Sequence, residues 1–359
     1  MNLKVDRRRI WSKVLAALGL WGVAALAIGL PPGPHFLNLA LMGSAVILLA
    51  ASPTPRTIGS LLLGAILLLP LHVRFWHPEA RHTLYSSPFI LAYLGIAAIG
   101  LLALQTFTRP VSREVALGVV GIPAFVLATV PYHAFLIRST PLTLDPALLR
   151  IDVALFGDAT YAAGRLLLQH PLLRWAAVHC YVALPLVGAT VYSLAVVGRA
   201  GRIRPANLLC LWGVAGVLGA ACYPLTPSVG PAFVFPGWPW HLPALHSGWI
   251  PGPPEVPRNA MPSLHAAWAL LVCWGARETP RWAWAVLLPW VVLMLLATVG
   301  IGGHYLIDLV AALPLAAAAA WITSRISGRL PSASELIGAT ATTDRALRHQ
   351  RDHEDPEPK

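Results

Sequence analysis

Charged side chains are scarce in this sequence. Only 11% of the 359 residues are Asp, Glu, Lys or Arg, whereas ordinary soluble domains carry about 25%. Hydrophobic residues make up 57% of the chain. A shortage of charge on this scale excludes a typical soluble domain and predicts a polytopic membrane protein.

Acidic residues are the scarcer of the two charge types. The chain has 15 Asp and Glu against 26 Lys and Arg, which gives a formal net charge of +11. In a soluble protein this excess would suggest nucleic-acid binding. Here most basic residues lie in short loops between apolar runs, where they set the orientation of membrane spans. We therefore expect no nucleic-acid partner.

Cysteine is rare as well. The four cysteines fall inside or at the ends of apolar runs, and no two of them have the CxxC spacing; they are Cys180, Cys210, Cys222 and Cys273. This pattern suggests neither a disulfide framework nor a zinc knuckle. We expect the four side chains to serve as small buried hydrophobic groups.

Apolar runs fill most of the chain and are separated by proline- and glycine-rich joints. They cover residues 11–30, 35–51, 58–72, 88–105, 115–135, 172–197, 206–223, 263–277, 282–300 and 303–325. A membrane-spanning helix needs about 20 apolar residues. The pattern therefore predicts an all-α polytopic membrane protein with about ten transmembrane helices.

The loops between these runs alternate in their content of basic residues. With a cytoplasmic N-terminus, the inside segments carry Lys4, Arg7, Arg8, Arg9, Arg56, Arg109, Arg113, Arg199, Arg202, Arg204, Arg277, Arg281, Arg325 and Arg329. The outside segments carry fewer basic residues for their length. This bias predicts a multi-pass protein, which we place in the plasma membrane, with both termini in the cytoplasm.

Three segments do not fit a membrane span. Residues 136–171 are too polar and proline-punctuated to span, and are expected to form one or two short helices at the outer interface. Residues 224–262 contain prolines that forbid a continuous helix and three tryptophans suited to the headgroup layer, so they are expected to form a lid or a substrate wall. Residues 326–359 turn polar and are expected to form a disordered cytoplasmic tail.

Two histidines and a carboxylate are predicted to meet at the outer face. The sequence RNAMPSLHAAW contains His265, and GIGGHYLIDL contains His304 and Asp308. The two histidines are separated by about two membrane-helix lengths, so a chain that enters and returns brings both to one face. Asp308 follows His304 by four residues and lies one turn deeper on the same helix face.

These residue types suit phosphoryl transfer. A carboxylate one turn below an imidazole can accept its N–H, which fixes the tautomer and makes the other nitrogen a nucleophile or a base. The second histidine can protonate a leaving oxygen and then activate an acceptor. Amides at the helix N-termini attract phosphate. Further phosphate- or substrate-binding candidates are Arg258, Asn259, Ser263 and Tyr305.

The sequences PSLH and GGHYLID resemble the second and third signature motifs of the type-2 phosphatidic acid phosphatase superfamily, and most of all its inositol phosphorylceramide synthase-like branch. The resemblance covers roughly residues 140–325 and includes DVALFGDATY and CYPLTPSVGP. It implies that His304 becomes a phosphohistidine, that Asp308 orients it and that His265 is the acid–base group. It also implies a core bundle of six helices.

The resemblance divides the chain into three parts. Residues 1–135 would form an additional five-helix transmembrane region, residues 136–325 the catalytic domain and residues 326–359 the tail. Two departures concern charge: the superfamily's phosphatases carry an arginine where this chain has Thr298, and a basic first motif where it has TPSVGP. The synthase-like branch shares both absences. Fewer fixed cations suit a singly charged phosphodiester.

The expected function is that of a membrane lipid phosphotransferase. It would cleave a lipid phosphoester through a phosphohistidine at the outer face and pass the phosphoryl group to an alcohol, without a metal or another cofactor. With water as acceptor the enzyme would be a lipid phosphate phosphatase. Two alternatives stay open: a metal-dependent hydrolase, with zinc on the two histidines and the carboxylate, and a transporter in which the motifs are structural.

Overall fold

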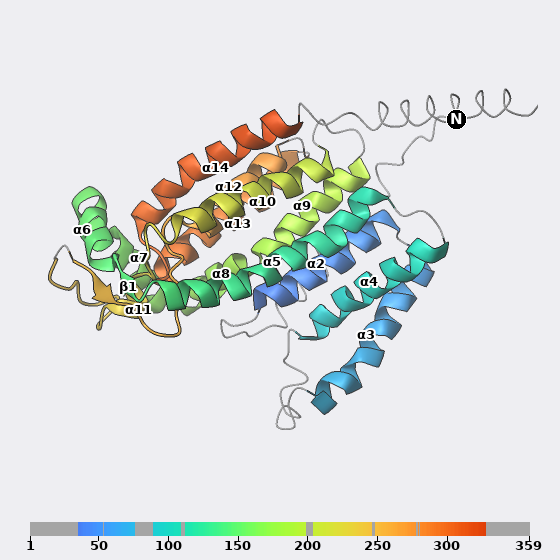
Figure 1. Ribbon diagram of the computed structural model, residues 1–359, viewed down its shortest axis with the longest axis horizontal. Coiled ribbons are helices and arrows are strands. Elements are labelled where there is room, and N and C mark those ends of the chain that lie inside the picture. Colours follow the sequence, from blue (N-terminus) through green and yellow to red (C-terminus); the bar gives the residue numbers. More distant parts are fainter. Residues whose placement is uncertain are drawn as a thin grey trace, which may run out of the picture.

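The computed structural model describes residues 35–52, 54–75, 89–108, 112–198, 204–245, 248–277, 279 and 281–327. Within these residues the fold is all-α apart from one short strand pair (Figure 1). The helices are α2 (His35–Ala51), α3 (Pro55–Phe75), α4 (Phe89–Thr108), α5 (Arg113–Ser139), α6 (Asp145–Phe156), α7 (Ala159–Gln169), α8 (Pro171–Val182), α9 (Leu184–Gly198), α10 (Pro205–Cys222), α11 (Pro231–Val234), α12 (Leu264–Gly275), α13 (Arg281–Gly300) and α14 (Leu306–Ser327).

The predicted apolar runs from 35–51 onward all coincide with helices. The run 11–30 and most of the predicted tail lie outside the described residues. The run 172–197 is one predicted helix that the structure divides into α8 and α9, which are bent by 54° at the break. Pro185 explains the break, because it has no N–H to donate to the carbonyl four residues earlier.

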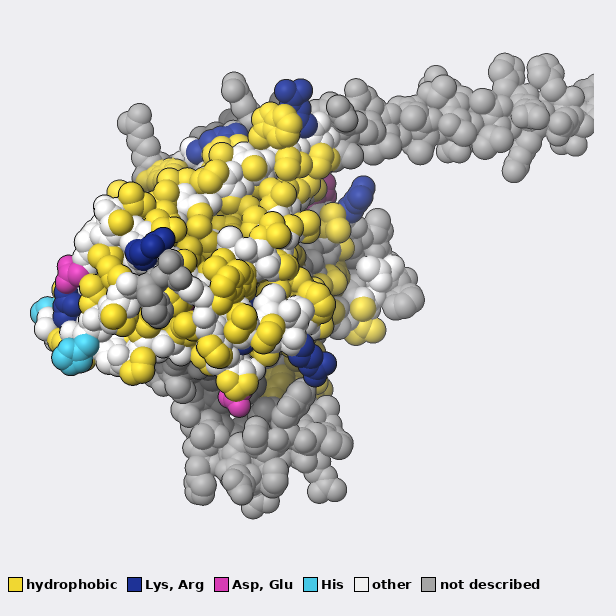
Figure 2. Space-filling view, turned by 60° about the vertical axis from the view of Figure 1, so that its left-hand side comes forward, with side chains coloured by type: hydrophobic (Ala, Val, Ile, Leu, Met, Phe, Trp, Pro, Cys, Tyr) yellow, Lys and Arg dark blue, Asp and Glu magenta, His cyan; other side chains and the backbone are white. Residues whose placement is uncertain are grey.

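The described helices form a polytopic membrane protein. Four helices, α5, α10, α13 and α14, are long and apolar enough to cross a membrane, and the bent pair α8–α9 would be a fifth. The apolar stretches of α2, α3, α4 and α12 are shorter. Figure 2 shows a face covered largely by hydrophobic side chains, with charged groups towards its edges. The all-α membrane fold is confirmed, while the count of ten spans stays a prediction.

The helices pack into two connected groups. The helices α10, α12 and α14 pack on one another, and α13 packs along α7 and α8. On the other side, α2 packs against α4, α5 and α9 (Figure 1). The α2 contacts join the N-terminal helices to the part that carries both histidines. The domain boundary at residue 135 stays a prediction, and α5 continues through it to Ser139.

One end of the bundle carries the segments that were not expected to span. The predicted short helices in 136–171 are α6 and α7. In the described part of the segment 224–262, the regular elements are the four-residue helix α11 and the strand β2 (Ile250–Pro251), which pairs antiparallel with β1 (Leu142–Thr143). Trp238 of this segment packs edge-on against Tyr161 of α7 at a ring-centroid distance of 4.5 Å. The described residues of this segment, 224–245 and 248–262, which we call the cover segment, therefore pack over this end of the bundle.

Candidate active site

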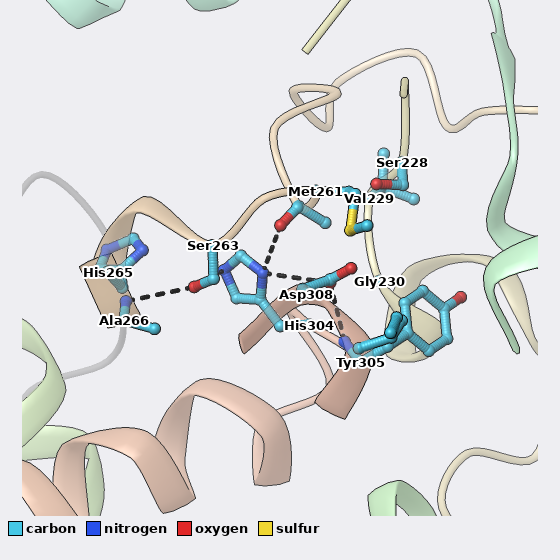
Figure 3. Close-up of polar contacts among 12 residues, drawn as sticks. Ser228, Val229, Gly230, Met261, Ser263, His265, Ala266, His304, Tyr305 and Asp308 are labelled. Atoms are coloured by element: carbon cyan, nitrogen blue, oxygen red, sulfur yellow. Dashed lines mark hydrogen bonds and ion pairs between the residues drawn. The ribbon is translucent and has the colours of Figure 1, made fainter. Parts of the chain in front are cut away.

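The start of α12 and the start of α14 lie side by side in the bundle (Figure 3). Ser263 is the N-cap residue of α12, and its hydroxyl accepts from the amide of Ala266 at 3.3 Å. The amide of Ser263 donates to the carbonyl oxygen of Asp308 at 3.1 Å. These contacts join the two motifs that lie about 40 residues apart in the sequence.

His304 has a defined tautomer. Its Nδ1 lies 2.8 Å from the carbonyl oxygen of Ala260 and 3.4 Å from a carboxylate oxygen of Asp308. Both neighbours are acceptors, so Nδ1 carries the proton and, in the neutral ring, Nε2 keeps its lone pair. The ring is only 5% exposed. The geometry therefore leaves Nε2 unprotonated and able to act as a nucleophile.

Ser263 lies at this unprotonated nitrogen. Its Oγ is 3.5 Å from Nε2 of His304, and the side chain is fully buried. Because the hydroxyl can rotate, it is able to donate to the Nε2 lone pair before a substrate is bound. Of the four sequence-derived binding candidates, Ser263 is the one that contacts His304.

Asp308 is buried and holds the loop that carries His304. One carboxylate oxygen accepts from the amide of Tyr305 at 2.9 Å and is also the oxygen near His304. The other has no hydrogen-bond partner among the described residues. Asp308 lies in the first turn of α14, but His304 precedes that helix, so the two residues do not share a helix face as the sequence predicted. The carboxylate still lies beside His304, although the nearer acceptor is the Ala260 carbonyl.

His265 lies across from His304, with 6.0 Å between the ring centroids. It sits in the first turn of α12 and is partly exposed. Its Nδ1 is 3.2 Å from the hydroxyl of Tyr181, a residue of α8 that sequence reasoning did not single out. Both histidines and the carboxylate are therefore brought together, as the sequence predicted.

The remaining binding candidates are engaged elsewhere. The Arg258 side chain is 1% exposed and donates to the carbonyl oxygens of Thr140 and Pro253, at 3.0 and 2.6 Å, and to that of Val256. Burial lowers the pKa of its guanidinium. Arg258 therefore fastens the cover segment to the end of α5, a role that differs from the expected contact with phosphate.

Asn259 and Tyr305 also have protein partners. The Asn259 amide nitrogen is 3.2 Å from Nε2 of His133, a histidine of α5. The Tyr305 hydroxyl donates to a carboxylate oxygen of Asp145 at 2.9 Å, and its side chain is fully buried. Tyr305 therefore supports the site through its hydrogen bond to Asp145.

The N-terminal amides of α14 are already capped. Leu306 donates to the hydroxyl of Thr160 at 3.2 Å, and Ile307 donates to a carboxylate oxygen of Asp152 at 2.8 Å. The expectation that these amides attract phosphate is therefore not met at α14. Thr160 in turn donates to Asp152 at 2.5 Å. Burial raises the pKa of Asp152, although these donors oppose the shift.

Asp145 organises the loop that corresponds to the first motif. Its carboxylate accepts from the amides of Val229 and Gly230, the latter at 2.9 Å. Burial raises its pKa, and the hydrogen bonds from these amides lower it. Gly230 has φ +95°, and a Cβ atom there would lie 2.4 Å from the carbonyl carbon of Gly303. The loop thus packs directly on the residues before His304.

Sequence reasoning missed the supporting groups. The signal for Asp145 and Asp152 was present, because both are carboxylates in an apolar stretch. Nothing in the sequence pointed to the Ala260 carbonyl or to Tyr181. Among the described residues, no three His, Cys, Asp or Glu side chains are arranged to hold a metal ion. The four cysteines are free and partly buried.

The geometry agrees with what comparison with known families shows. No curated protein and no solved structure matches the chain. One family model does, and it covers α6 to α14 almost completely together with the segment between α10 and α12. Residues 146–322, which supply both histidines and the carboxylate, match the family model described as the PAP2 superfamily.

Proposed function

We propose that this protein is a membrane phosphotransferase for lipid phosphoesters and that His304 carries the phosphoryl group. The observation that supports this most strongly is the pair of acceptors at Nδ1 of His304, the Ala260 carbonyl and the Asp308 carboxylate. They hold the proton on Nδ1 and leave Nε2 free to attack phosphorus. The match to the PAP2 superfamily supports chemistry on a phosphoester.

In the first step, the Nε2 lone pair of His304 forms a bond to phosphorus while the bond from phosphorus to the leaving oxygen breaks. The protonated ring of His265, 6.0 Å away between ring centroids, gives its proton to that oxygen. The phosphorylated His304 ring is positively charged and keeps the proton on Nδ1. The Ala260 carbonyl and Asp308 stabilise this charge.

In the second step, an alcohol or water replaces the imidazole. His265, now neutral, takes the proton of the incoming hydroxyl as its oxygen bonds to phosphorus. The bond between phosphorus and Nε2 breaks, and its electron pair returns to His304. Both histidines then have their starting protonation states. An alcohol acceptor completes a transfer, and water completes a hydrolysis.

Several described groups that could donate to a phosphate are already bonded to the protein, and this favours a singly charged donor. Arg258 donates to backbone carbonyls, and the Thr298 hydroxyl donates to the Met294 carbonyl at 2.8 Å. The amides of Val229 and Gly230 donate to Asp145. A phosphodiester needs fewer positive groups than a doubly charged phosphomonoester. This supports the transferase over the phosphatase and agrees with the inositol phosphorylceramide synthase-like resemblance.

The proposed orientation places the site at the outer face of the plasma membrane. The helices α12 and α14 both begin at the site, so their arginine-bearing ends, at Arg277 and Arg325, lie at the opposite end of the bundle. The positive-inside rule assigns that end to the cytoplasm. In this arrangement both termini are cytoplasmic and residues 1–135 form a region added to the catalytic domain.

A trapping experiment tests the proposal. Purified protein is incubated with headgroup-phosphate-labelled phospholipids and lipid phosphates, with and without candidate alcohols and with EDTA. We expect an acid-labile, alkali-stable phosphoenzyme that is absent from His304→Gln, and transfer of label to an alcohol. Wild-type turnover by His304→Gln would overturn the nucleophile assignment.

The same assay separates the alternatives. Release of inorganic phosphate alone would assign the protein to the phosphatases. Loss of turnover in EDTA, with recovery on adding zinc, would favour the metal-dependent hydrolase. Transport of a labelled solute by a protein with both His265→Ala and His304→Ala would favour the transporter.

A further inference from the structure

His265 lies in a group of three aromatic rings. Tyr181 stacks on it with ring centroids 4.3 Å apart and an interplanar angle of 24°. Phe36 of α2 lies 5.1 Å from the same imidazole and 5.5 Å from the Tyr181 ring. Each ring contacts the other two, so rotation of the imidazole about its own axis is opposed on two sides.

Tyr181 reaches this position because of the break between α8 and α9. The break falls at Ala183, between Val182 and Leu184 and two residues after Tyr181. Pro185 has no N–H with which to continue the helical bonds, so the chain bends by 54° there. The bend sets the direction of α8 and with it the side of His265 that Tyr181 covers.

The Tyr181 hydroxyl contacts one of the two ring nitrogens of His265. It lies 3.2 Å from Nδ1, so Nε2 is the nitrogen left for the substrate. An acid–base histidine works best when one nitrogen keeps its proton while the other gives and takes one. A hydroxyl oxygen can accept from Nδ1–H in both the charged and the neutral ring.

We propose that Tyr181 is a positioning residue for His265, held in place together with Phe36 of the N-terminal helices. Its hydroxyl oxygen accepts a hydrogen bond from Nδ1–H throughout the cycle, and Nε2 gives its proton to the leaving oxygen and later receives one from the acceptor. Tyr181 keeps its own proton, so the balance of the reaction is unchanged. This inference rests on the proposed acid–base role of His265.

Phe36 gives the N-terminal helices a part in this site. It lies in the first turn of α2, which packs along α9, and its ring touches both His265 and Tyr181. The N-terminal helices thus contribute one of the side chains that surround the His265 ring. Removing the Phe36 ring opens one side of His265 without touching a hydrogen bond.

A substrate-free measurement tests the tautomer directly. Protein labelled with ¹⁵N-histidine is examined by NMR in lipid nanodiscs, and the His265 signals are assigned by their loss in His265→Gln. We expect neutral His265 to carry its proton on Nδ1, and Tyr181→Phe to lose that preference. A proton on Nε2 in the wild type, or an unchanged spectrum in Tyr181→Phe, would overturn the inference.

A matched tyrosine provides the control. Tyr192 is also buried, and its hydroxyl donates to a backbone carbonyl, that of Glu114, at 2.5 Å. Tyr192→Phe therefore removes one buried tyrosine hydroxyl from a purely structural place. We expect it to leave the His265 signals as in the wild type. A change of the same size in both variants would mean that the Tyr181 effect is structural.

Kinetics give a second readout. With the fluorescent phospholipid that the wild type turns over fastest, we expect Tyr181→Phe to lower kcat about tenfold or more, with little change in KM, because acid–base catalysis contributes about 10²- to 10⁴-fold. Its pH–rate profile should also shift. The titratable groups that face His265 are His304, His133 on α5 and Tyr181 itself.

Phe36→Leu, which keeps an apolar side chain, should lower kcat by a smaller factor than Tyr181→Phe.

The two proposals fail in different ways. Wild-type turnover by His265→Gln would remove the acid–base role and the inference with it. Loss of turnover in His265→Gln, combined with a wild-type pH profile and tautomer in Tyr181→Phe, would leave the proposed function standing and remove Tyr181 from it.

Discussion

The carbonyl oxygen of Ala260 lies closer to Nδ1 of His304, at 2.8 Å, than the carboxylate of Asp308 does, at 3.4 Å. A backbone carbonyl cannot be protonated at physiological pH, so it holds the Nδ1 proton whatever the charge of Asp308. In the proposed mechanism, the carboxylate adds the negative charge that stabilises a phosphorylated, positively charged ring. The Ala260 carbonyl is therefore sufficient to fix the tautomer, and Asp308 adds electrostatic support that the carbonyl alone does not give.

This division of roles predicts a graded response at Asp308. We expect His304→Ala to abolish turnover and Asp308→Asn to lower kcat about 10²-fold, because Ala260 still fixes the tautomer of His304. Asp308→Ala, which also loses the bond to the Tyr305 amide, should be more severe. Turnover is measured on protein whose elution in detergent matches the wild type. Equal loss in Asp308→Asn and His304→Ala would contradict the division.

Arg258 is expected to act on stability. Arg258→Ala removes a buried guanidinium that donates to the carbonyls of Thr140, Pro253 and Val256, and hydrogen bonds to charged groups contribute about 1.5–3 kcal/mol each. We expect a clear fall in the thermal unfolding midpoint in detergent, with KM of the remaining folded enzyme little changed. Arg150→Ala, at an exposed position of α6, is the control. A raised KM at unchanged stability would return Arg258 to the phosphate site.

Gly230 is expected to tolerate no side chain. Its φ of +95° is unfavourable for other residues, and a Cβ would lie 2.4 Å from the Gly303 backbone. We expect Gly230→Ala to destabilise the fold by more than about 2 kcal/mol, because strain and overlap both act. Gly213→Ala in α10, where nothing lies within 4 Å of the added carbon, is the matched control. Similar unfolding midpoints for the two variants would contradict the close packing of the loops.

The buried carboxyl of Asp152 predicts a pH dependence of stability. Burial raises its pKa in the folded protein, so its contribution to stability is fully present below the unfolded pKa, about 3.9, and is lost as pH rises through the folded value. The wild type should therefore gain stability relative to Asp152→Asn as pH falls from 7 towards 4. Thermal unfolding of both proteins across this range measures the difference. A constant or shrinking difference would mean that the hydrogen bonds to Asp152 outweigh burial.

The fold class and the composition of the site's centre could be predicted from local patterns. The run 35–51 coincides with helix α2, because continuous apolar stretches bounded by proline and glycine identify buried helices directly. Helix length placed His265 and His304 together. The four-residue helical repeat placed Asp308 near His304, although His304 precedes the first residue of α14. The break at Ala183 was missed because the run 172–197 is apolar both before and after Pro185, so hydropathy does not mark the break.

The sequence by itself determined that this chain inserts into a membrane as helices and that two histidines and a carboxylate meet at one end. Those properties depend on side-chain polarity and on spacing along the chain. Only the tertiary structure decided that the Ala260 carbonyl fixes His304, that Arg258 holds a loop, and that Tyr181 and Phe36 enclose His265. These contacts join residues up to 229 positions apart or involve backbone atoms. Residue type alone specifies neither which distant residues meet nor the direction of a backbone carbonyl.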